Sequence, residues 1–225
     1  MKQYFLGIEF GSTRIKAVLL DEKHAIVKSG DYTWKSSLEN GVWTYHMEDV
    51  QEGLRTAIQN LGELPGKISA MGVSGMMHGY LAFDKDWNLL APFRTWQNTM
   101  TGEAADKLTE AFGFNIPQRW SAAHLYQAVL NGEPHVKNIA HVTTLAGYVH
   151  YLLTGENVLG VGEASGMFPI DSETLTYDAA MLDKFDALMA KYGFDWNIRA
   201  VLPEVRTAGQ SAGLLTPSGS EYLGG

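Results

Sequence analysis

The 225-residue sequence contains no cysteine. Disulfide bridges and thiolate metal sites are therefore impossible within it. It also lacks any uninterrupted apolar run close to the roughly 20 residues that span a bilayer. The opening residues, MKQYFLGIEF, have neither the long apolar segment nor the small-residue cleavage site of a signal peptide. We therefore expect a cytoplasmic protein with no membrane partner.

Basic residues are outnumbered by acidic ones, 17 against 25, and the formal net charge is −8. Because phosphate backbones select for basic surfaces, this balance argues against nucleic acid as a partner. A local basic pocket for a small phosphorylated ligand stays open. Apolar residues make up 45 % of the chain, which is enough to form the core of one large domain or two small ones.

The periodicity of apolar residues predicts strands first and helices later. This order is typical of an α/β fold with a mixed sheet, helices on its faces and a helical insertion. Residues 84–88 are expected to form a turn, and residues 80–83 and 89–90 a small hairpin. Further strands are predicted at 5–10, 14–20, 25–29 with 32–34 (irregular), 68–73 and 167–170, and helices at 47–61, 102–112, 122–131, 146–153 and 179–192.

A polar turn, Gly11-Ser12-Thr13, separates the first two expected strands. It is neither a Walker loop, which needs GxxxxGK[ST], nor a dinucleotide fingerprint, which opens a helix. A tight turn of this kind can direct successive backbone N–H groups at phosphate oxygens, with hydroxyl donors from Ser12 and Thr13. Lys16 can add positive charge, and Glu9 can hold Mg²⁺ directly or through water. The same residues also fit an ordinary hairpin with a solvated lysine, so the turn alone leaves both interpretations open.

Five segments of the chain resemble, in order, segments of the FGGY carbohydrate kinases of the actin-like ATPase superfamily, and xylulokinases in particular. The resemblance covers nearly the whole chain. It implies an α/β, RNase H-like domain with a mixed five-stranded sheet flanked by helices and a helical insertion. The five segments are GIEFGSTRIKAVLLD (7–21), SGMMHGYLAFD (74–84), LLAPFRTWQN (89–98), LTGENVLGVGEASGMFPID (153–171) and LPEVRTAGQSAGLLT (202–216).

The resemblance also implies a sugar pocket, and the chemistry of the residues fits one. An imidazole can hydrogen-bond to a sugar hydroxyl, and methionine and indole can pack against carbon skeletons. Taken alone, His78 also fits a structural histidine and Trp96 a core side chain. The implied substrate-binding residues are Met77, His78, Trp96 and Asn98, with Arg94 and Gln97 as further candidates; the implied phosphate-binding residues are Gly11, Ser12, Thr13 and Lys16, and Glu9 is the implied ligand of Mg²⁺.

Several positions depart from the pattern of the resembled family, among them the order of Ser12 and Thr13, Gln97 where Asn is usual, and Glu163 where Asp is usual. Glu9 stands where these kinases usually have Asp, Met76 where xylulokinases usually have Gln, and Asn98 where Asp is common. The extra methylene of Glu9 shifts its carboxylate by about 1.5 Å. The identity of the sugar therefore stays open. Residues 153–171 are interpreted as mainly structural.

The general base of the resembled kinases is an Asp in a glycine-rich segment after the LPxV…LT stretch, and this chain ends at Gly225, before any such segment. We therefore expect the general base beyond Gly225 and assign no catalytic residue to the chain. Residues 1–225 are expected to be the N-terminal, sugar-binding domain of a two-domain protein, with the C-terminal ATP-binding domain absent. The isolated chain is expected to be inactive. A homodimer stays open.

The implied activity is ATP- and Mg²⁺-dependent phosphorylation of a ketose or polyol hydroxyl. One alternative is a sugar-sensing or binding module of the same fold that has lost phosphoryl transfer, which the exchange at Glu9 would allow. Another is an RNase H-like nuclease with Glu9 in a two-metal carboxylate cluster. The nuclease would need several convergent acids and a basic groove, and neither is evident in the sequence.

Overall fold

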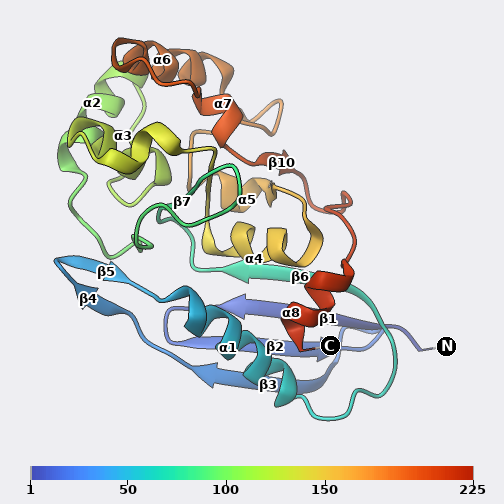
Figure 1. Ribbon diagram of the computed structural model, residues 1–225. Helices are drawn as coiled ribbons and strands as arrows, with labels where there is room; N and C mark the ends of the chain where they lie inside the picture. Colours follow the sequence, from blue (N-terminus) through green and yellow to red (C-terminus); the bar gives the residue numbers. More distant parts are fainter. Residues whose placement is uncertain (1, 225) are drawn as a thin grey trace.

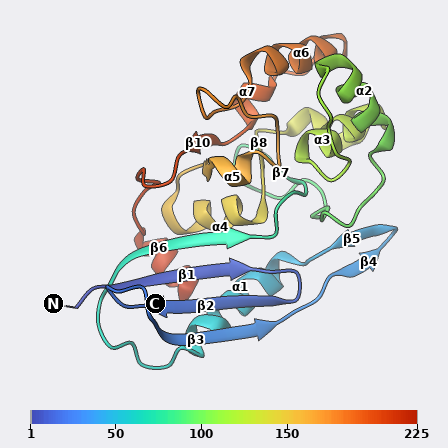
Figure 2. The same cartoon turned by 180° about the vertical axis from the view of Figure 1, so that it is seen from behind.

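The computed structural model of the protein describes residues 2–224. Its largest sheet is mixed, with four strands in the order β3-β2-β1-β6 (Figures 1 and 2). Strand β2 pairs antiparallel with both β1 and β3, whereas β1 and β6 run parallel. The four strands are β1 (Tyr4–Phe10), β2 (Arg14–Leu20), β3 (Ile26–Thr33) and β6 (Ile68–Gly75).

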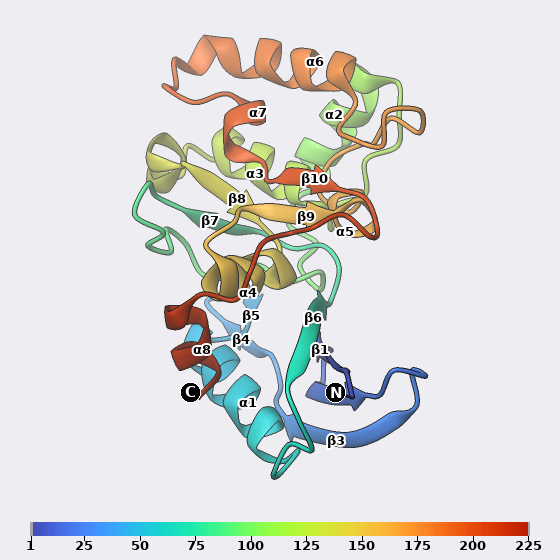
Figure 3. The same ribbon diagram turned by 90° about the vertical axis from the view of Figure 1, so that its right-hand side faces the viewer.

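The predicted α/β class and mixed sheet are confirmed, but the predicted count of five strands is wrong for the sheet formed by residues 2–224. After β6 the chain leaves the sheet. Helix α4 (Leu145–Thr154) packs next to β6, on the side away from β1 (Figures 1 and 3). A Cβ atom at Gly75 would lie only 3.3 Å from the Cβ of Ala146. This helix therefore packs closely against the C-terminal end of β6.

Strands β1 and β2 form because their apolar residues alternate with polar or small ones. In β1 the residues Leu6, Ile8 and Phe10 are buried, and in β2 so are Ile15 and Leu19. Helix α1 (Met47–Gln59) covers this face of the sheet and begins with two acidic residues that favour its N-terminus. Its predicted last two residues lie in the following turn.

Helix α1 approaches the sheet closely, because glycines lie at the crossing. A Cβ atom at Gly30 would lie 2.2 Å from the carbonyl oxygen of Ala57, and one at Gly53 would lie 2.5 Å from Ile15 Cδ1. A side chain at Gly30 would require the helix to move, because it meets helix backbone, whereas one at Gly53 would displace the side chains of Ile15 and Tyr32. This first core, between the sheet, α1 and α4, supports the hairpin turn that joins β1 to β2.

The second core lies in the helical part of the chain, around α2, α3 and α6. No helix of residues 2–224 is both long and apolar enough to traverse a bilayer. The helices here are α2 (Gly102–Phe112), α3 (Ser121–Leu130), α5 (Val161–Ala164), α6 (Ala179–Met189) and α7 (Ile198–Val201), with 3₁₀ turns at Pro134–Asn138 and Ala190–Tyr192. Helix α8 (Pro217–Leu223) packs instead against α1 and α4, in the first core.

Six short strands form three two-stranded ribbons outside the main sheet. Each strand has only three residues, so none shows a period in the sequence, and most were not predicted. The predicted hairpin is confirmed only in part, since Phe83 bridges Leu89 but the main partner of its strand is β8. The ribbons are β4 (Ser37–Glu39) with β5 (Val42–Thr44), β7 (Leu81–Phe83) with β8 (His141–Thr143), and β9 (Val158–Gly160) with β10 (Glu204–Arg206).

The predicted strand at 167–170 is wrong. Met167 and Phe168 form a turn after α5 and are fully buried in the helical core. Only Ile170 makes a single bridge, to Tyr177. An apolar run of four residues is equally compatible with a buried turn and with a strand, because both bury the same side chains. The five predicted helices are confirmed to within three residues at each end.

The general base is predicted to lie beyond Gly225, the last residue of the chain. Gly225, beyond which the base is expected, lies outside the described residues, which end at 224. The structure therefore neither confirms nor contradicts a general base beyond Gly225, and its location stays a prediction.

Candidate functional site

A cleft of about 440 Å³ lies where β1 and β6 end side by side. The carboxyl ends of parallel strands are the usual place for ligands in α/β sheets, because the loops that follow them diverge there. The walls come from the hairpin turn after β1, the loop after β6, and two residues of the helical part. The lining residues are Glu9 to Ser12, Ser74 to His78, Trp96 and Arg119.

Two side chains anchor the hairpin turn by donating hydrogen bonds to its carbonyl oxygens. The buried Trp34 donates its indole N–H to the oxygen of Gly11 (2.8 Å), and Tyr45 donates its hydroxyl to the oxygen of Ser12 (2.7 Å). Because the carbonyl of one residue and the N–H of the next point in opposite directions across a trans peptide, the amides of Ser12 and Thr13 face away from these anchors. Neither N–H group donates a hydrogen bond within residues 2–224, so the predicted role of the turn in binding phosphate stays a prediction.

Glu9 and Lys16 lie directly opposite each other on β1 and β2. Lys16 Nζ is 3.0 Å from Glu9 Oε2, and both side chains are about half exposed. Glu9 lines the cleft, whereas Lys16 reaches it only through this ion pair. Within residues 2–224 no group of three acidic, histidine or cysteine side chains could hold a metal ion. A single carboxylate beside a phosphate nest still fits Mg²⁺, which usually keeps several waters and binds substrate phosphates.

The loop after β6 places Met77 and His78 in the cleft. His78 has a φ of 71°, and the following Gly79 has a φ of 104°, so the backbone turns sharply here. The ring Nδ1 of His78 lies 3.1 Å from the carbonyl oxygen of Gly166. Since that oxygen can only accept, Nδ1 carries the proton and Nε2 keeps a lone pair that can accept a hydrogen bond from a hydroxyl group.

The ionisation of His78 favours this role. Burial lowers the pKa of the His78 imidazole, the hydrogen bond to Gly166 opposes this, and the positive charge of Arg119 lowers the pKa further. The ring is therefore neutral at pH 7. A neutral ring with Nδ1–H fixed is a hydrogen-bond acceptor with a defined direction.

Two large apolar side chains remain open to the cleft. Trp96 is 44 % exposed and Met77 is 38 % exposed. Trp96 is therefore not a core side chain. An indole face and a thioether suit the C–H faces of a sugar, which pack on flat or flexible apolar surfaces.

Asn98 does not reach the cleft. It is 3 % exposed, and its amide oxygen accepts from the N–H of Trp43 (2.9 Å). Its amide nitrogen donates to the carbonyl of Trp43 (2.8 Å). The side chain thereby ties strand β5 to the loop that carries Trp96. The structure gives Asn98 a scaffolding role, and we do not place it among the residues that touch a substrate.

Arg94, the further polar candidate, is also directed away from the cleft. It is 7 % exposed, pairs with Glu133, and lies with its guanidinium carbon 5.4 Å from the centre of the Tyr80 ring.

The structure thus unites six predicted site residues in one cleft and leaves three at or beyond its edge. The six are Glu9, Gly11, Ser12, Met77, His78 and Trp96; the three are Thr13, Lys16 and Asn98.

Two residues that contribute to the site from distant segments of the chain were not predicted. Arg119, just before α3, lines the cleft, and its carbonyl oxygen accepts the N–H of Gly79 (3.2 Å). Gly166 supports His78 from the segment that was interpreted as mainly structural. Arg119 lies outside the five resembled segments, and Gly166 lies inside one of them but has no side chain that would indicate a role. Arg119 and Gly166 lie about 40 and 90 residues further along the chain than the loop that they support.

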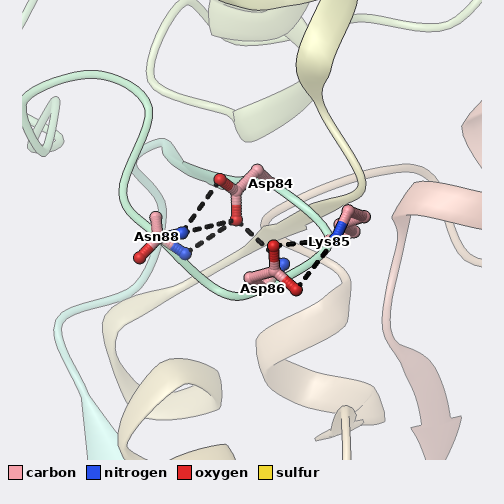
Figure 4. Close-up of polar contacts among 4 residues, drawn as sticks. All are labelled: Asp84, Lys85, Asp86 and Asn88. Atoms are coloured by element: carbon pink, nitrogen blue, oxygen red, sulfur yellow. Dashed lines mark hydrogen bonds and ion pairs between the residues drawn. The ribbon is translucent and has the colours of Figure 1, made fainter.

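A second polar cluster, at the turn after β7, is structural (Figure 4). Asp84 accepts the backbone N–H groups of Asp86 and Asn88 at 2.9 Å each, and Asp86 pairs with Lys85 at 2.8 Å. The side-chain and backbone hydrogen bonds from Asn88 lower the pKa of the Asp84 carboxyl. The predicted turn at 84–88 is confirmed, and the carboxylates of Asp84 and Asp86 make their hydrogen bonds and ion pair with other residues of the turn.

Two of the titratable groups that lie outside the cleft lining, His124 and Glu163, have pKa values displaced by burial. His124 is fully buried between Tyr80 and the helical core, neither ring nitrogen has a partner within residues 2–224, and burial lowers its pKa to about 3. Burial raises the pKa of Glu163, in α5, to about 6, although a hydrogen bond with Thr144 opposes this. These groups affect stability and do not contact the cleft.

Comparisons with known proteins show the family and the fold of the chain. Residues 4–225 match the model of the FGGY family of carbohydrate kinases, N-terminal domain. A glycerol kinase of Thermococcus gammatolerans is 25 % identical over 95 % of the chain and 45 % of its own length, and a xylulose kinase of Lactococcus lactis is 22 % identical over 81 % and 39 %. The crystal structure of gluconate kinase from Lactobacillus acidophilus superimposes with a TM-score of 0.83 at 19 % identity, over 100 % of the chain and 46 % of that protein. The chain thus spans less than half the length of these relatives.

Proposed function

The chain belongs to the FGGY family of carbohydrate kinases, and on this basis we propose that the full-length protein transfers the γ-phosphoryl group of ATP to a hydroxyl group of a sugar or polyol. One observation carries the proposal. Gly11 and Ser12 of the anchored turn and the loop at Met77–His78 open onto the same cleft. A phosphate donor held by the turn would lie next to an acceptor held by the loop, as an in-line transfer requires.

The acceptor is held by the second loop. His78 accepts a hydrogen bond from a hydroxyl group at Nε2, while Met77 and Trp96 pack against the carbon skeleton. Fixing the acceptor in this way lowers the entropic cost of reaching the transition state. Glycerol, xylulose and gluconate, the compounds in the names of the relatives, are the first acceptors to test.

The donor is held by the hairpin turn. The amides of Ser12 and Thr13 bind phosphate oxygens, and Glu9 holds Mg²⁺, directly or through water, while Lys16 orients Glu9. When bound, Mg²⁺ neutralises charge on the phosphates of ATP. We assign no general base among the residues that line the cleft. We propose that the base lies beyond Gly225 and that it and most of the adenosine pocket belong to the part of the relatives that this chain does not span.

A phosphorylation screen of the full-length protein tests the proposal. It uses ATP and Mg²⁺ with polyols, ketoses and sugar acids of three to six carbons, and it follows formation of the sugar phosphate. We expect transfer to at least one acceptor by the full-length protein and none by residues 1–225 alone. Absence of transfer to every acceptor would contradict the proposal. If calorimetry then showed sugar binding without ATP binding, a non-catalytic sugar-binding module would be the better description.

A further inference from the structure

One short segment of the chain contacts both walls of the cleft. Tyr45 donates its hydroxyl to the carbonyl oxygen of Ser12, in the hairpin turn, at 2.7 Å. Two residues earlier, the carbonyl oxygen of Trp43 accepts the N–H of Thr95, in the loop that carries the cleft tryptophan, at 3.1 Å. We call residues 43–45 the connector. It consists of the end of strand β5 and the next residue, so that about 7 Å of extended backbone separates its two contacts.

The side chain of Asn98 fixes the connector to that loop. Its amide oxygen accepts the N–H of Trp43 at 2.9 Å, and its amide nitrogen donates to the carbonyl oxygens of Trp43 at 2.8 Å and of Thr95 at 3.0 Å. Pairing with both polar groups of one backbone residue needs an acceptor and a donor on the same side chain. An amide has both, whereas an ionised carboxylate has only acceptors. The contact therefore requires an amide at position 98.

The sheet joins the two walls at a different point. The N–H of Met76, just after β6, donates to the carbonyl oxygen of Phe10, at the end of β1, at 2.8 Å. A single line of hydrogen bonds lets two walls pivot about it, and a second connection at another point prevents this. The connector is such a second connection.

Each wall is also held together by contacts of its own. On the acceptor wall, which carries His78 and Trp96, Tyr80 and Arg94 exchange both backbone hydrogen bonds, at 2.8 and 3.1 Å. On the donor wall, the hydrogen bonds to the hairpin turn come from other side chains. Loss of the Asn98 amide would therefore change the position of one wall relative to the other and leave both walls intact.

We propose that Asn98 is a positioning residue for phosphoryl transfer, which acts through the connector to set the placement of the acceptor against the phosphate donor. This inference rests on the proposed function and adds a residue to the same site. Reacting atoms have to lie about 3 to 3.5 Å apart and in line, and a misplacement of about 1 Å can lower a rate about 100-fold. A residue that fixes only the relative position of the walls affects the rate of transfer more than the binding of either substrate.

The reaction itself is the one in the proposed function. The acceptor oxygen forms the new bond to the γ-phosphorus of ATP. The bond from that phosphorus to the β–γ bridging oxygen breaks, and its electron pair leaves with ADP. The hydroxyl proton passes to the general base that we place beyond Gly225.

Steady-state kinetics of the full-length protein test the inference, with ATP, Mg²⁺ and the acceptor found in the screen. Asn98→Ala removes the three side-chain hydrogen bonds, and Asn98→Asp, of nearly the same size, directs an oxygen at the two carbonyl oxygens. We expect kcat to fall by about 10- to 100-fold in both variants. The dissociation constants of the acceptor and of adenylyl imidodiphosphate, a non-hydrolysable analogue of ATP, should each change by less than about threefold when measured alone by calorimetry.

A matched control makes the same exchange outside the cleft lining. Asn197 caps helix α7, where its side-chain oxygen accepts the N–H of Ala200 at 2.9 Å. Asn197→Ala should therefore lower the melting temperature and keep the kcat of the wild type. All variants are assayed well below the melting temperature of the least stable one, and Asn98→Ala alone decides the test if Asn98→Asp does not fold.

A second variant detaches the other end of the connector. Tyr45→Phe removes the hydrogen bond to Ser12 and keeps the aromatic ring. Once one end is detached, detaching the other should change little, so the double variant with Asn98→Ala should have a kcat within about threefold of the lower single variant. Losses that multiply would mean that the two residues act on separate walls, and they would overturn the inference.

The remaining outcomes separate this inference from the proposed function. If kcat is unchanged in Asn98→Ala, or if the dissociation constants rise as much as kcat falls, the inference is overturned, while transfer by the wild type leaves the proposed function standing. If the wild type transfers nothing, the proposed function fails, and calorimetry decides the inference. Binding of glycerol, xylulose and gluconate is then compared with and without adenylyl imidodiphosphate. A change in affinity of about threefold or more that disappears in Asn98→Ala supports the connector, and an equal ratio in both proteins overturns it.

Discussion

Replacing Gly166 by alanine should damage the site through one added methyl group. A Cβ atom at Gly166 would lie 2.6 Å from His78 Nδ1 and 3.0 Å from His78 Cε1, whereas ordinary contacts begin at 3.4 Å. The imidazole therefore has to withdraw by about 0.8 Å, the difference between 3.4 and 2.6 Å. The 3.1 Å hydrogen bond from Nδ1 to Gly166 is then lost, and with it the preference for the tautomer that leaves Nε2 as an acceptor.

The expected loss follows from these two effects. A hydrogen bond of this kind contributes about 1 kcal/mol, and a misplacement of about 1 Å can reduce a rate by about 100-fold. We expect kcat/KM for the sugar to fall by about 10- to 100-fold in the full-length protein. The KM for ATP should change by less than about twofold, because the phosphate turn lies on the other wall. Steady-state kinetics with the acceptor found in the screen measures both.

A matched control lies four residues earlier. Gly162 is in the same segment, and a Cβ atom there would meet nothing within 4 Å. Gly162→Ala should keep wild-type kinetics and gain up to about 1 kcal/mol of stability, because it lies within α5. Adding Gly166→Ala to His78→Ala should cost little more than His78→Ala alone, since the glycine acts through the histidine. Wild-type kcat/KM in Gly166→Ala, or equal losses in both glycine variants, would refute this role of Gly166.

Three further predictions concern the anchors and the buried titratable groups. Tyr45→Phe removes the hydrogen bond to the Ser12 carbonyl, so we expect KM for ATP to rise about fivefold for a stability cost of about 1 kcal/mol; an unchanged KM would mean that the turn does not bind phosphate. Glu163 has a pKa of about 6 in the folded protein and 4.5 as its ordinary value. The folded protein is therefore more stable at low pH, where Glu163 is neutral, and loses this stability as pH rises and the carboxyl ionises. Relative to wild type, Glu163→Gln should gain about 2 kcal/mol between pH 4.5 and 7, measured by denaturant unfolding. The pKa of His124 is about 3 in the folded protein and 6.5 as its ordinary value, so the wild-type protein loses stability as pH falls below 6.5. From pH 5 to 6.5 the stability of His124→Leu relative to wild type should therefore decrease by about 2 kcal/mol. A difference from wild type that stays constant with pH, in Glu163→Gln or in His124→Leu, would contradict the assigned pKa.

Prediction from the sequence worked best where residues close in the chain form the structure. Strands β1 and β2, the turn between them and helix α1 follow from local apolar patterns and a short connection. It worked poorly for the three-residue strands and for Met167 and Phe168, because burial in the helical core leaves the same apolar signal as a strand. Met77 and His78 came from a resemblance of motifs, which local physics alone would not have separated from a structural loop.

The sequence by itself determined the α/β class, the family, and the polar turn with its neighbours Glu9 and Lys16, because those features depend on residue order over short distances. The tertiary structure decided which candidates share a cleft. It excluded Asn98 and Arg94 from the candidate site, because their polar groups bond to partners distant in the sequence, and it placed Arg119 and Gly166 at the site. Contacts between segments tens of residues apart are set by how the cores pack, and no local pattern records them.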